Sequence, residues 1–144
     1  LNIPLTIVWD GHIPAGRTTE ALVSTVDVLP TLVELTGATP PSEIDGRSFA
    51  SILRGESLEH RDVAFSVLQQ AQEEYRYCVH DTRYLYITNN NPAQQVELYD
   101  LLSDPKRERN LAGDPIMSHR CNEMREQLNL WLQRHGKALL PKEP

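Results

Sequence analysis

The 144-residue chain is 40% hydrophobic and 24% charged, a balance typical of a globular domain and not of a disordered chain. A chain of this length buries about two-thirds of its surface on folding, so it can build a core without disulfides or a metal. Its 14 basic and 20 acidic residues leave a formal net charge of −6. This charge argues against nucleic acid and against an anionic membrane as partners, because both attract basic proteins. No run of about 18 apolar residues occurs, so no membrane-spanning helix is predicted.

The cysteines and histidines do not form a recognisable metal or disulfide pattern. Cys78 and Cys121 can form at most one bridge, which the sequence does not decide, and no C-x-x-C pair occurs. The five histidines stand singly, with no spacing that places two of them on one face. We therefore expect no dedicated metal site.

The chain opens on an apolar, β-rich run. Residues 3–9 end at Asp10 and Gly11, a pattern that favours a short strand buried on both faces, as in parallel sheets. Because this run begins within three residues of Leu1, we expect the chain to be part of a larger protein.

A helix is predicted over residues 28–36. Asp27 is a good N-cap, Pro30 fits the first turn, and Gly37 is a natural residue to follow the last turn. The helix is apolar nearly all round, which is typical of a buried helix. The rest of the chain is too small to cover it, a second indication of an absent partner domain.

The sequence changes character near residue 58. A linker begins at 40–42 and a short helix, capped by Ser48, ends at Arg54. Four strand candidates with short, turn-rich connections follow, which favours an antiparallel sheet. They are residues 62–68, 74–80, 83–88 and 96–101.

The last predicted element is an amphipathic helix. Asp114 caps it, Pro115 takes its first position and Gly136 ends it. Its apolar side chains recur at steps of four and three residues, so the helix should lie on the sheet. The fold class expected is an α/β fragment, a strand plus a buried helix, followed by an α+β subdomain with a four-stranded antiparallel sheet and a packed C-terminal helix.

Few side chains suggest chemistry. Cys78 and His80 share one strand face, but a single Cys on a strand is more often a packing residue than a nucleophile. Each of the isolated aspartates lies next to a turn, a cap or a strand end, where capping is the simpler role. These residues are Asp10, Asp27, Asp45 and Asp100.

Two polar groups remain as candidates. A cationic group could form a weak anion site, although a solvated charge cluster is the simpler interpretation. It consists of Arg47, Arg54, His60 and Arg61. The asparagines of residues 89–91 are expected at an exposed hairpin tip, and loops of this kind do carry recognition. No catalytic constellation follows from the residues alone.

Five segments, in the same order along the chain, resemble the C-terminal part of the formylglycine-dependent sulfatases, members of the alkaline phosphatase superfamily. They are residues 3–16 (IPLTIVWDGHIPAG), 23–37 (VSTVDVLPTLVELTG), 45–55 (DGRSFASILRG), 60–65 (HRDVAF) and 97–111 (ELYDLLSDPKRERNL). Two positions depart from the family pattern: Ala50 replaces a frequent Pro, and Arg107 replaces a Glu.

The resemblance implies two regions, residues 1–57 as the end of the large α/β sulfatase domain and residues 58–144 as its C-terminal subdomain. It also places the chemistry elsewhere. Formylglycine arises from a C/S-x-P-x-R motif near the N-terminus of a sulfatase, where Asp and Asn residues bind calcium and basic residues hold the sulfate. The segment beginning at Cys78 is no substitute, because His80 stands where the motif needs Pro. No catalytic, cofactor-binding or metal-binding residue is therefore assigned to this chain.

The expected role is to supply scaffold and one side of the substrate cleft. The candidate rim residues lie in the loop from Thr88 to Gln95, and they are Asn89, Asn90, Asn91 and Gln94. The expected partners are the missing N-terminal sulfatase domain and, in the parent enzyme, a sulfate ester. The chain alone is expected to be inactive and to self-associate through its apolar surfaces.

Two alternatives remain open. The chain could belong to a related phosphonate or phosphodiester hydrolase, or it could be a stand-alone, non-catalytic binding module. The resemblance alone suggests a periplasmic, extracellular or lysosomal location.

Overall fold

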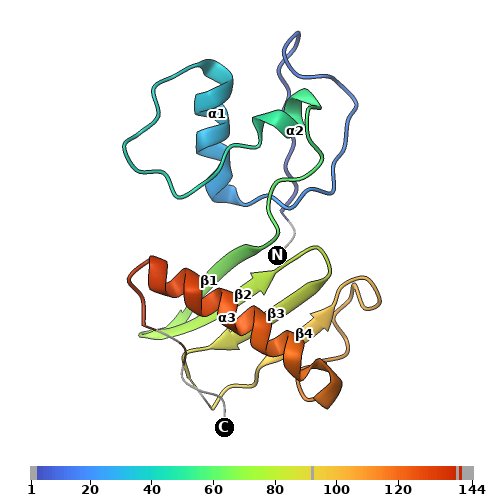
Figure 1. The fold of residues 1–144 in the computed structure, drawn as a ribbon, viewed down its shortest axis with the longest axis vertical. Coiled ribbons are helices and arrows are strands. Elements are labelled where there is room, and N and C mark those ends of the chain that lie inside the picture. The colour runs from blue at the N-terminus through green and yellow to red at the C-terminus, as the bar shows by residue number, and fades with distance from the viewer. Residues whose placement is uncertain (1–2, 92, 139, 141–144) are drawn as a thin grey trace. The chain divides into compact units, whose positions relative to one another are not determined.

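The computed structural model describes residues 3–91, 93–138 and 140. The chain divides into two compact units, Leu1–Arg61 and Asp62–Pro144 (Figure 1). The division expected between residues 57 and 58 remains a prediction about the parent enzyme. Each unit is described by itself below.

The first unit contains two short helices. The 3-10 turn η1 (Thr25–Asp27) leads directly into α1 (Val28–Thr36), and α2 covers Ala50–Arg54. The bounds of α1 agree with the prediction, because Gly37 adopts a left-handed φ of 67° and ends the helix. At α2, the hydroxyl of Ser48 accepts a hydrogen bond from the backbone N–H of Ala50 at 3.2 Å.

The predicted strand at residues 3–9 is wrong for this unit. This segment has no regular structure, and Ile3, Leu5 and Val8 are exposed. A parallel strand needs neighbouring strands for its backbone groups, and no strand forms among the described residues of the first unit.

The helix expected to be buried is also only partly covered. Leu29 and Leu32 of α1 are 53% and 47% exposed, and Thr31 is the buried residue of the helix. The helix is apolar on most sides, as predicted, but the described residues of this unit do not cover it.

The second unit is a four-stranded antiparallel sheet in the order β1-β2-β3-β4, as predicted. Its strands are β1 (Ala64–Ala71), β2 (Glu74–His80), β3 (Tyr84–Asn89) and β4 (Glu97–Asp100). One row of facing residues crosses all four strands and forms the centre of the buried face. It runs Phe65, Val79, Tyr86 and Leu98.

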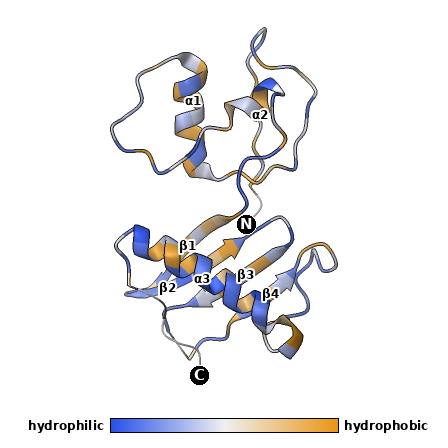
Figure 2. Cartoon of the chain, viewed as in Figure 1, coloured by the Kyte–Doolittle hydropathy of each residue, from blue (hydrophilic) through white to orange (hydrophobic). Residues whose placement is uncertain are grey.

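A long helix, α3 (Ser118–Arg134), lies across this face of the sheet (Figure 1). The 3-10 turn η2 (Pro115–Met117) precedes it, and the carboxylate of Asp114 accepts from the N–H of Ile116 at 3.0 Å. Hydrophobic and hydrophilic residues alternate around α3 (Figure 2). Its inner side chains are buried against the sheet in one core, so the predicted packing is confirmed. They are Cys121, Met124, Leu128 and Leu132.

None of the helices among the described residues is long and apolar enough to cross a membrane.

Candidate functional site

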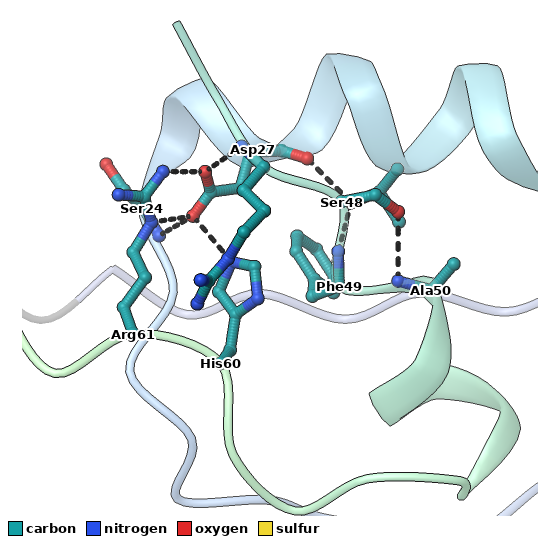
Figure 3. A network of polar contacts seen from close by, with 9 residues as sticks. Ser24, Asp27, Ser48, Phe49, Ala50, His60 and Arg61 are labelled. Carbon is teal, nitrogen blue, oxygen red and sulfur yellow. Dashed lines mark hydrogen bonds and ion pairs between the residues drawn. The ribbon is translucent and has the colours of Figure 1, made fainter.

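The most densely connected polar group in the first unit is the carboxylate of Asp27, which is fully buried (Figure 3). It sits at the end of η1, directly before α1. Two backbone donors reach it: the N–H of Ser24 at 2.9 Å from Oδ2 and the N–H of Arg47 at 2.8 Å from Oδ1. The carboxylate thereby joins the turn before α1 to the segment that follows the linker.

Two side chains from further along the chain complete the group. Arg61 makes a two-pronged contact, in which Nε donates to Oδ2 of Asp27 at 2.6 Å and a terminal nitrogen donates to Oδ1. Nε2 of His60 lies 3.1 Å from Oδ2, and its ring meets Phe49 edge-on at 5.8 Å between ring centres. A planar guanidinium matches a carboxylate well in this arrangement.

These contacts decide the charge state of Asp27. Burial by itself raises the pKa of a carboxyl, but Arg61, the two backbone N–H groups and His60 together hold the pKa of Asp27 well below its usual range. The pKa of Arg61 is raised in turn by Asp27. Asp27 is therefore ionised at any ordinary pH, and its oxygens are fully engaged. Such a carboxylate serves as a structural anion and not as a general base.

A second layer fixes the same junction. The hydroxyl of Thr31 donates to the backbone oxygen of Asp27 at 2.6 Å and accepts from the N–H of Phe49 at 3.0 Å. Gly46 passes so close to η1 that a Cβ there would stand 1.9 Å from the carbonyl oxygen of Val26. The chain needs glycine at this point because of the close backbone approach.

The sequence predicted the position of Asp27 correctly, but not its hydrogen-bond partner. Asp27 occupies the predicted N-cap position of α1, yet its side chain makes no capping hydrogen bond to that helix. It accepts from Ser24 instead, so the capping prediction is wrong in its partner.

Of the predicted cationic group, Arg47 and Arg54 are exposed, as in a solvated cluster, whereas His60 and Arg61 are not. His60 and Arg61 bind Asp27, whereas Arg54 pairs with Glu34 at 2.9 Å. The anion that His60 and Arg61 bind therefore comes from the chain itself. Because Asp27 and Arg61 lie far apart in sequence, no local spacing rule indicates their pairing.

Cys78 and His80 lie on β2, on the face turned away from α3. Cys78 is buried, and burial raises its pKa to about 11, so the thiol stays protonated near neutral pH. Burial lowers the pKa of His80. The buried position of Cys78 fits a packing role.

The candidate rim residues have structural contacts. Asn89 is the last residue of β3 and only 7% exposed, so the expectation of an exposed side chain is wrong there. Its Oδ1 is buried without a hydrogen-bond partner. Asn90 accepts from the N–H of Tyr75 at 2.8 Å and donates to the carbonyl of Glu73 at 2.6 Å. This side chain ties the loop to the β1–β2 turn.

The remaining two candidates lie further along the loop. Oδ1 of Asn91 accepts from the N–H of Ala93 at 3.0 Å, and its Nδ2 lies 3.4 Å from a carboxylate oxygen of Glu74. The backbone N–H of Gln94 donates to the carbonyl of Asn91 at 3.1 Å. Gln94 is half-buried. The side chains of Asn90 and Asn91 thus hold the described part of the loop by hydrogen bonds.

Within the part of the chain that the structure describes, no group of three or more His, Cys, Asp or Glu residues is placed to hold a metal ion.

A four-stranded antiparallel sheet with a packed C-terminal helix is the architecture of the C-terminal subdomain of sulfatases of the alkaline phosphatase superfamily. The family model described as N-sulphoglucosamine sulphohydrolase, C-terminal, matches residues 1–134. The chain belongs to this family.

Individual relatives agree with this assignment. An ulvan-active sulfatase of Formosa agariphila is 26% identical over 171 residues, covering 96% of this chain and 34% of the relative. A Delta 4,5-hexuronate-2-O-sulfatase of Bacteroides thetaiotaomicron is 33% identical over 141 residues, covering 92% of this chain and 29% of the relative. A multifunctional alkaline phosphatase superfamily protein of Trinickia caryophylli is 30% identical over 156 residues, covering 96% of this chain and 30% of the relative.

Solved structures show the same fold. A 2-O GAG sulfatase aligns with a TM-score of 0.68 and 34% identity, over 75% of this chain and 24% of that one. A phosphonate monoester hydrolase of Agrobacterium radiobacter aligns with a TM-score of 0.64 and 24% identity, over 78% of this chain and 25% of that one. The chain therefore spans about a third or less of the length of these proteins.

Proposed function

We propose that the protein carrying this chain is a sulfatase, a sulfuric ester hydrolase, and that the chain supplies scaffold and one side of the substrate cleft. The observation that carries the proposal is the family match over residues 1–134, together with relatives named as sulfatases. The chain alone is proposed to be inactive. The names of the relatives favour a sulfated carbohydrate as the substrate class.

The principal partner is proposed to be the N-terminal sulfatase domain. Leu29 and Leu32 present apolar surface on α1, and residues 3–9 offer an apolar segment without strand neighbours. Burial against a larger domain removes this surface from water, at roughly 25 cal/mol per Å² of apolar area. Residues 3–9 would then gain the strand neighbours that the first unit lacks.

Calcium and formylglycine are proposed to belong to that N-terminal domain. Calcium needs six to eight oxygen ligands, often from carboxylates, and the described residues offer no cluster of that kind. We therefore assign no step involving calcium or formylglycine to the residues of this chain.

A test of the assignment begins with the coding sequence upstream of Leu1. We expect a C/S-x-P-x-R motif in the same reading frame, and formylglycine at its first residue in the mass spectrum of the purified protein. A start codon directly before Leu1, with no such motif in frame, would exclude sulfatase chemistry. It would favour the alternative of a stand-alone, non-catalytic binding module.

The loop that contains Asn89, Asn90, Asn91 and Gln94 is proposed to line the rim of the cleft. The hydrogen bonds of Asn90 and Asn91 support this role, because they hold these polar side chains in one arrangement. Asn90 is a poor probe, since its removal breaks the bonds to Tyr75 and Glu73. Gln94 is the better one, because its side chain makes no hydrogen bond among those described for this loop.

We expect Gln94→Ala in the complete enzyme to raise KM several-fold while kcat changes little, because a rim side chain binds substrate away from the reacting bond. Gln133→Ala, an exposed position on α3, is the matched control. Steady-state sulfate release measures both variants. Equal KM values for Gln94→Ala, Gln133→Ala and the unaltered enzyme would remove Gln94 from the rim.

A phosphonate or phosphodiester hydrolase is the second candidate. The fold that the chain shares with the phosphonate monoester hydrolase of Agrobacterium radiobacter supports this candidate. Parallel assays with a sulfate monoester and a phosphonate monoester of the same alcohol separate the two activities. A higher kcat/KM for the phosphonate would favour this candidate over the sulfatase.

A further inference from the structure

The loop proposed to line the cleft rim is tied to the hairpin between β1 and β2. Asn90 donates to the carbonyl of Glu73 at 2.6 Å and accepts from the N–H of Tyr75 at 2.8 Å. Nδ2 of Asn91 lies 3.4 Å from a carboxylate oxygen of Glu74. These contacts join hairpin and loop into one surface. We call this surface the joint rim, and it comprises residues 71–75, 88–91 and 93–95.

The joint rim carries only negative charge. Glu73 and Glu74 are its only charged residues, so its formal charge is −2. Neither carboxylate forms an ion pair within the described part of the chain. Arg76, the next residue of β2, donates to the carboxylate of Glu97 on β4, and this pair adds no net charge. The two hairpin carboxylates are therefore not neutralised by the residues around them.

The geometry of the hairpin does not call for glutamate. Glu73 has a left-handed φ of 61°. Glycine, asparagine and aspartate adopt this backbone conformation more readily than glutamate does. Because the turn itself favours other residues, the charge of the side chain is the property of Glu73 that remains to be explained.

A rim of carboxylates and amides discriminates among saccharides by charge. Carboxylate oxygens accept hydrogen bonds from sugar hydroxyls, and the amides of Asn and Gln both donate and accept. A sulfate or carboxylate on the sugar residue at the rim would instead meet the like charge of Glu74, and juxtaposed like charges disfavour binding. The joint rim therefore fits an uncharged, hydroxyl-bearing sugar residue, next to the residue that carries the reacting sulfate.

We propose that Glu74 is a specificity-determining residue, which favours saccharides with a neutral residue at the rim over saccharides with an anionic residue there. Glu73 adds to the same negative field. The inference rests on the proposed function, because it places the substrate of a sulfatase at this loop. Since Glu74 acts away from the reacting bond, its effect falls on the KM of the anionic substrate and not on kcat.

The test uses the complete enzyme and two disaccharides built on a sulfated residue that it hydrolyses, with either glucose or glucuronate as the second residue. Sulfate release gives kcat/KM at low ionic strength, where charge repulsion is least screened. We expect the glucose compound to be preferred about fivefold or more, and Glu74→Gln to reduce this preference to about twofold or less. Glu126→Gln removes the same charge from an exposed position on α3 and should keep the full preference.

The outcomes separate this inference from the proposed function. Sulfate release from both compounds with equal kcat/KM, or a preference for glucuronate, would overturn the inference and leave the sulfatase assignment standing. Equal preferences in Glu74→Gln and Glu126→Gln would also overturn it, because the discrimination would then arise elsewhere in the enzyme. An enzyme that releases sulfate from no saccharide would contradict the proposed function, on which the inference depends.

Discussion

At the scale of single residues, Asp27 contributes more to the first unit than its sequence position indicates. A local rule predicted a helix cap, and the structure instead has a buried carboxylate with Arg61 and His60 as partners. The acid and its position were predictable, because Asp before an apolar helix is a familiar pattern. The partners were not, because a contact across such a sequence separation is set by tertiary packing.

Replacing Asp27 by Asn leaves the charge of Arg61 without its partner in a largely buried site. Breaking such a pair costs about 3–5 kcal/mol, so we expect backbone amides of α1 to exchange with deuterium at least 100-fold faster. Asp45→Asn is the control, because Asp45 is exposed and also carries one negative charge. Equal exchange rates in the two variants would contradict the structural role of Asp27.

The contribution of Asp27 should also depend on pH. Its folded pKa is lowered, so the stabilisation is fully present above the unfolded pKa of about 3.9 and is lost as the pH falls toward the folded pKa. The difference in exchange between the unaltered protein and Asp27→Asn should shrink by up to about tenfold per pH unit below pH 4. A difference that stays constant down to pH 3 would be inconsistent with this pKa.

Gly46 tests the close approach between η1 and the segment after the linker. An added methyl would collide with the backbone of Val26, and overpacking of this kind typically costs about 1–3 kcal/mol. Gly113→Ala is the matched control, because a Cβ there meets nothing within 4 Å. Chemical denaturation monitored at α1 should show the loss for Gly46→Ala alone, and similar midpoints for both variants would argue against the close contact.

At the scale of elements, local signals were sufficient wherever the element completes its own contacts. The range of α1 followed from Pro30 and Gly37, and the four strands followed from alternation and turns. Residues 3–9 have equally strong β character but form no strand, because a strand depends on neighbours that the described unit does not provide. Sequence predicts the tendency of a segment, whereas its environment decides the outcome.

The packing of α3 on the sheet depends on side chains such as Leu128, which is fully buried in the core. Leu128→Ala should lower the free energy of unfolding of the second unit by about 2–5 kcal/mol. Leu130→Ala, two residues away and exposed, should change it by less than about 0.5 kcal/mol. Urea denaturation followed through Trp131 compares them, and a similar loss in both variants would contradict the observed face of α3.

At the scale of the molecule, the two units are built on different principles. The second has an apolar core drawn entirely from residues after 62, whereas the first is organised around a buried ion pair and a few apolar side chains. A chain of residues 62–144 should therefore fold alone and unfold cooperatively in urea. Residues 1–61 alone should give no cooperative transition, and the opposite result would contradict this division.

The function could be predicted from the sequence only in part. The family was identifiable from segments such as residues 23–37 and 97–111, and the family match over residues 1–134 confirmed it. The rim remains a prediction, because no pattern in residues 89–94 shows what the loop faces.

The central proposal is that the protein carrying this chain is a sulfatase. The most direct test is sulfate release by the purified product of the complete reading frame, measured by ion chromatography on a panel of sulfated saccharides. The account predicts sulfate from at least one saccharide, with no release after residues 62–144 are deleted. No sulfate from any member of the panel, with turnover of a phosphonate monoester under the same conditions, would contradict it.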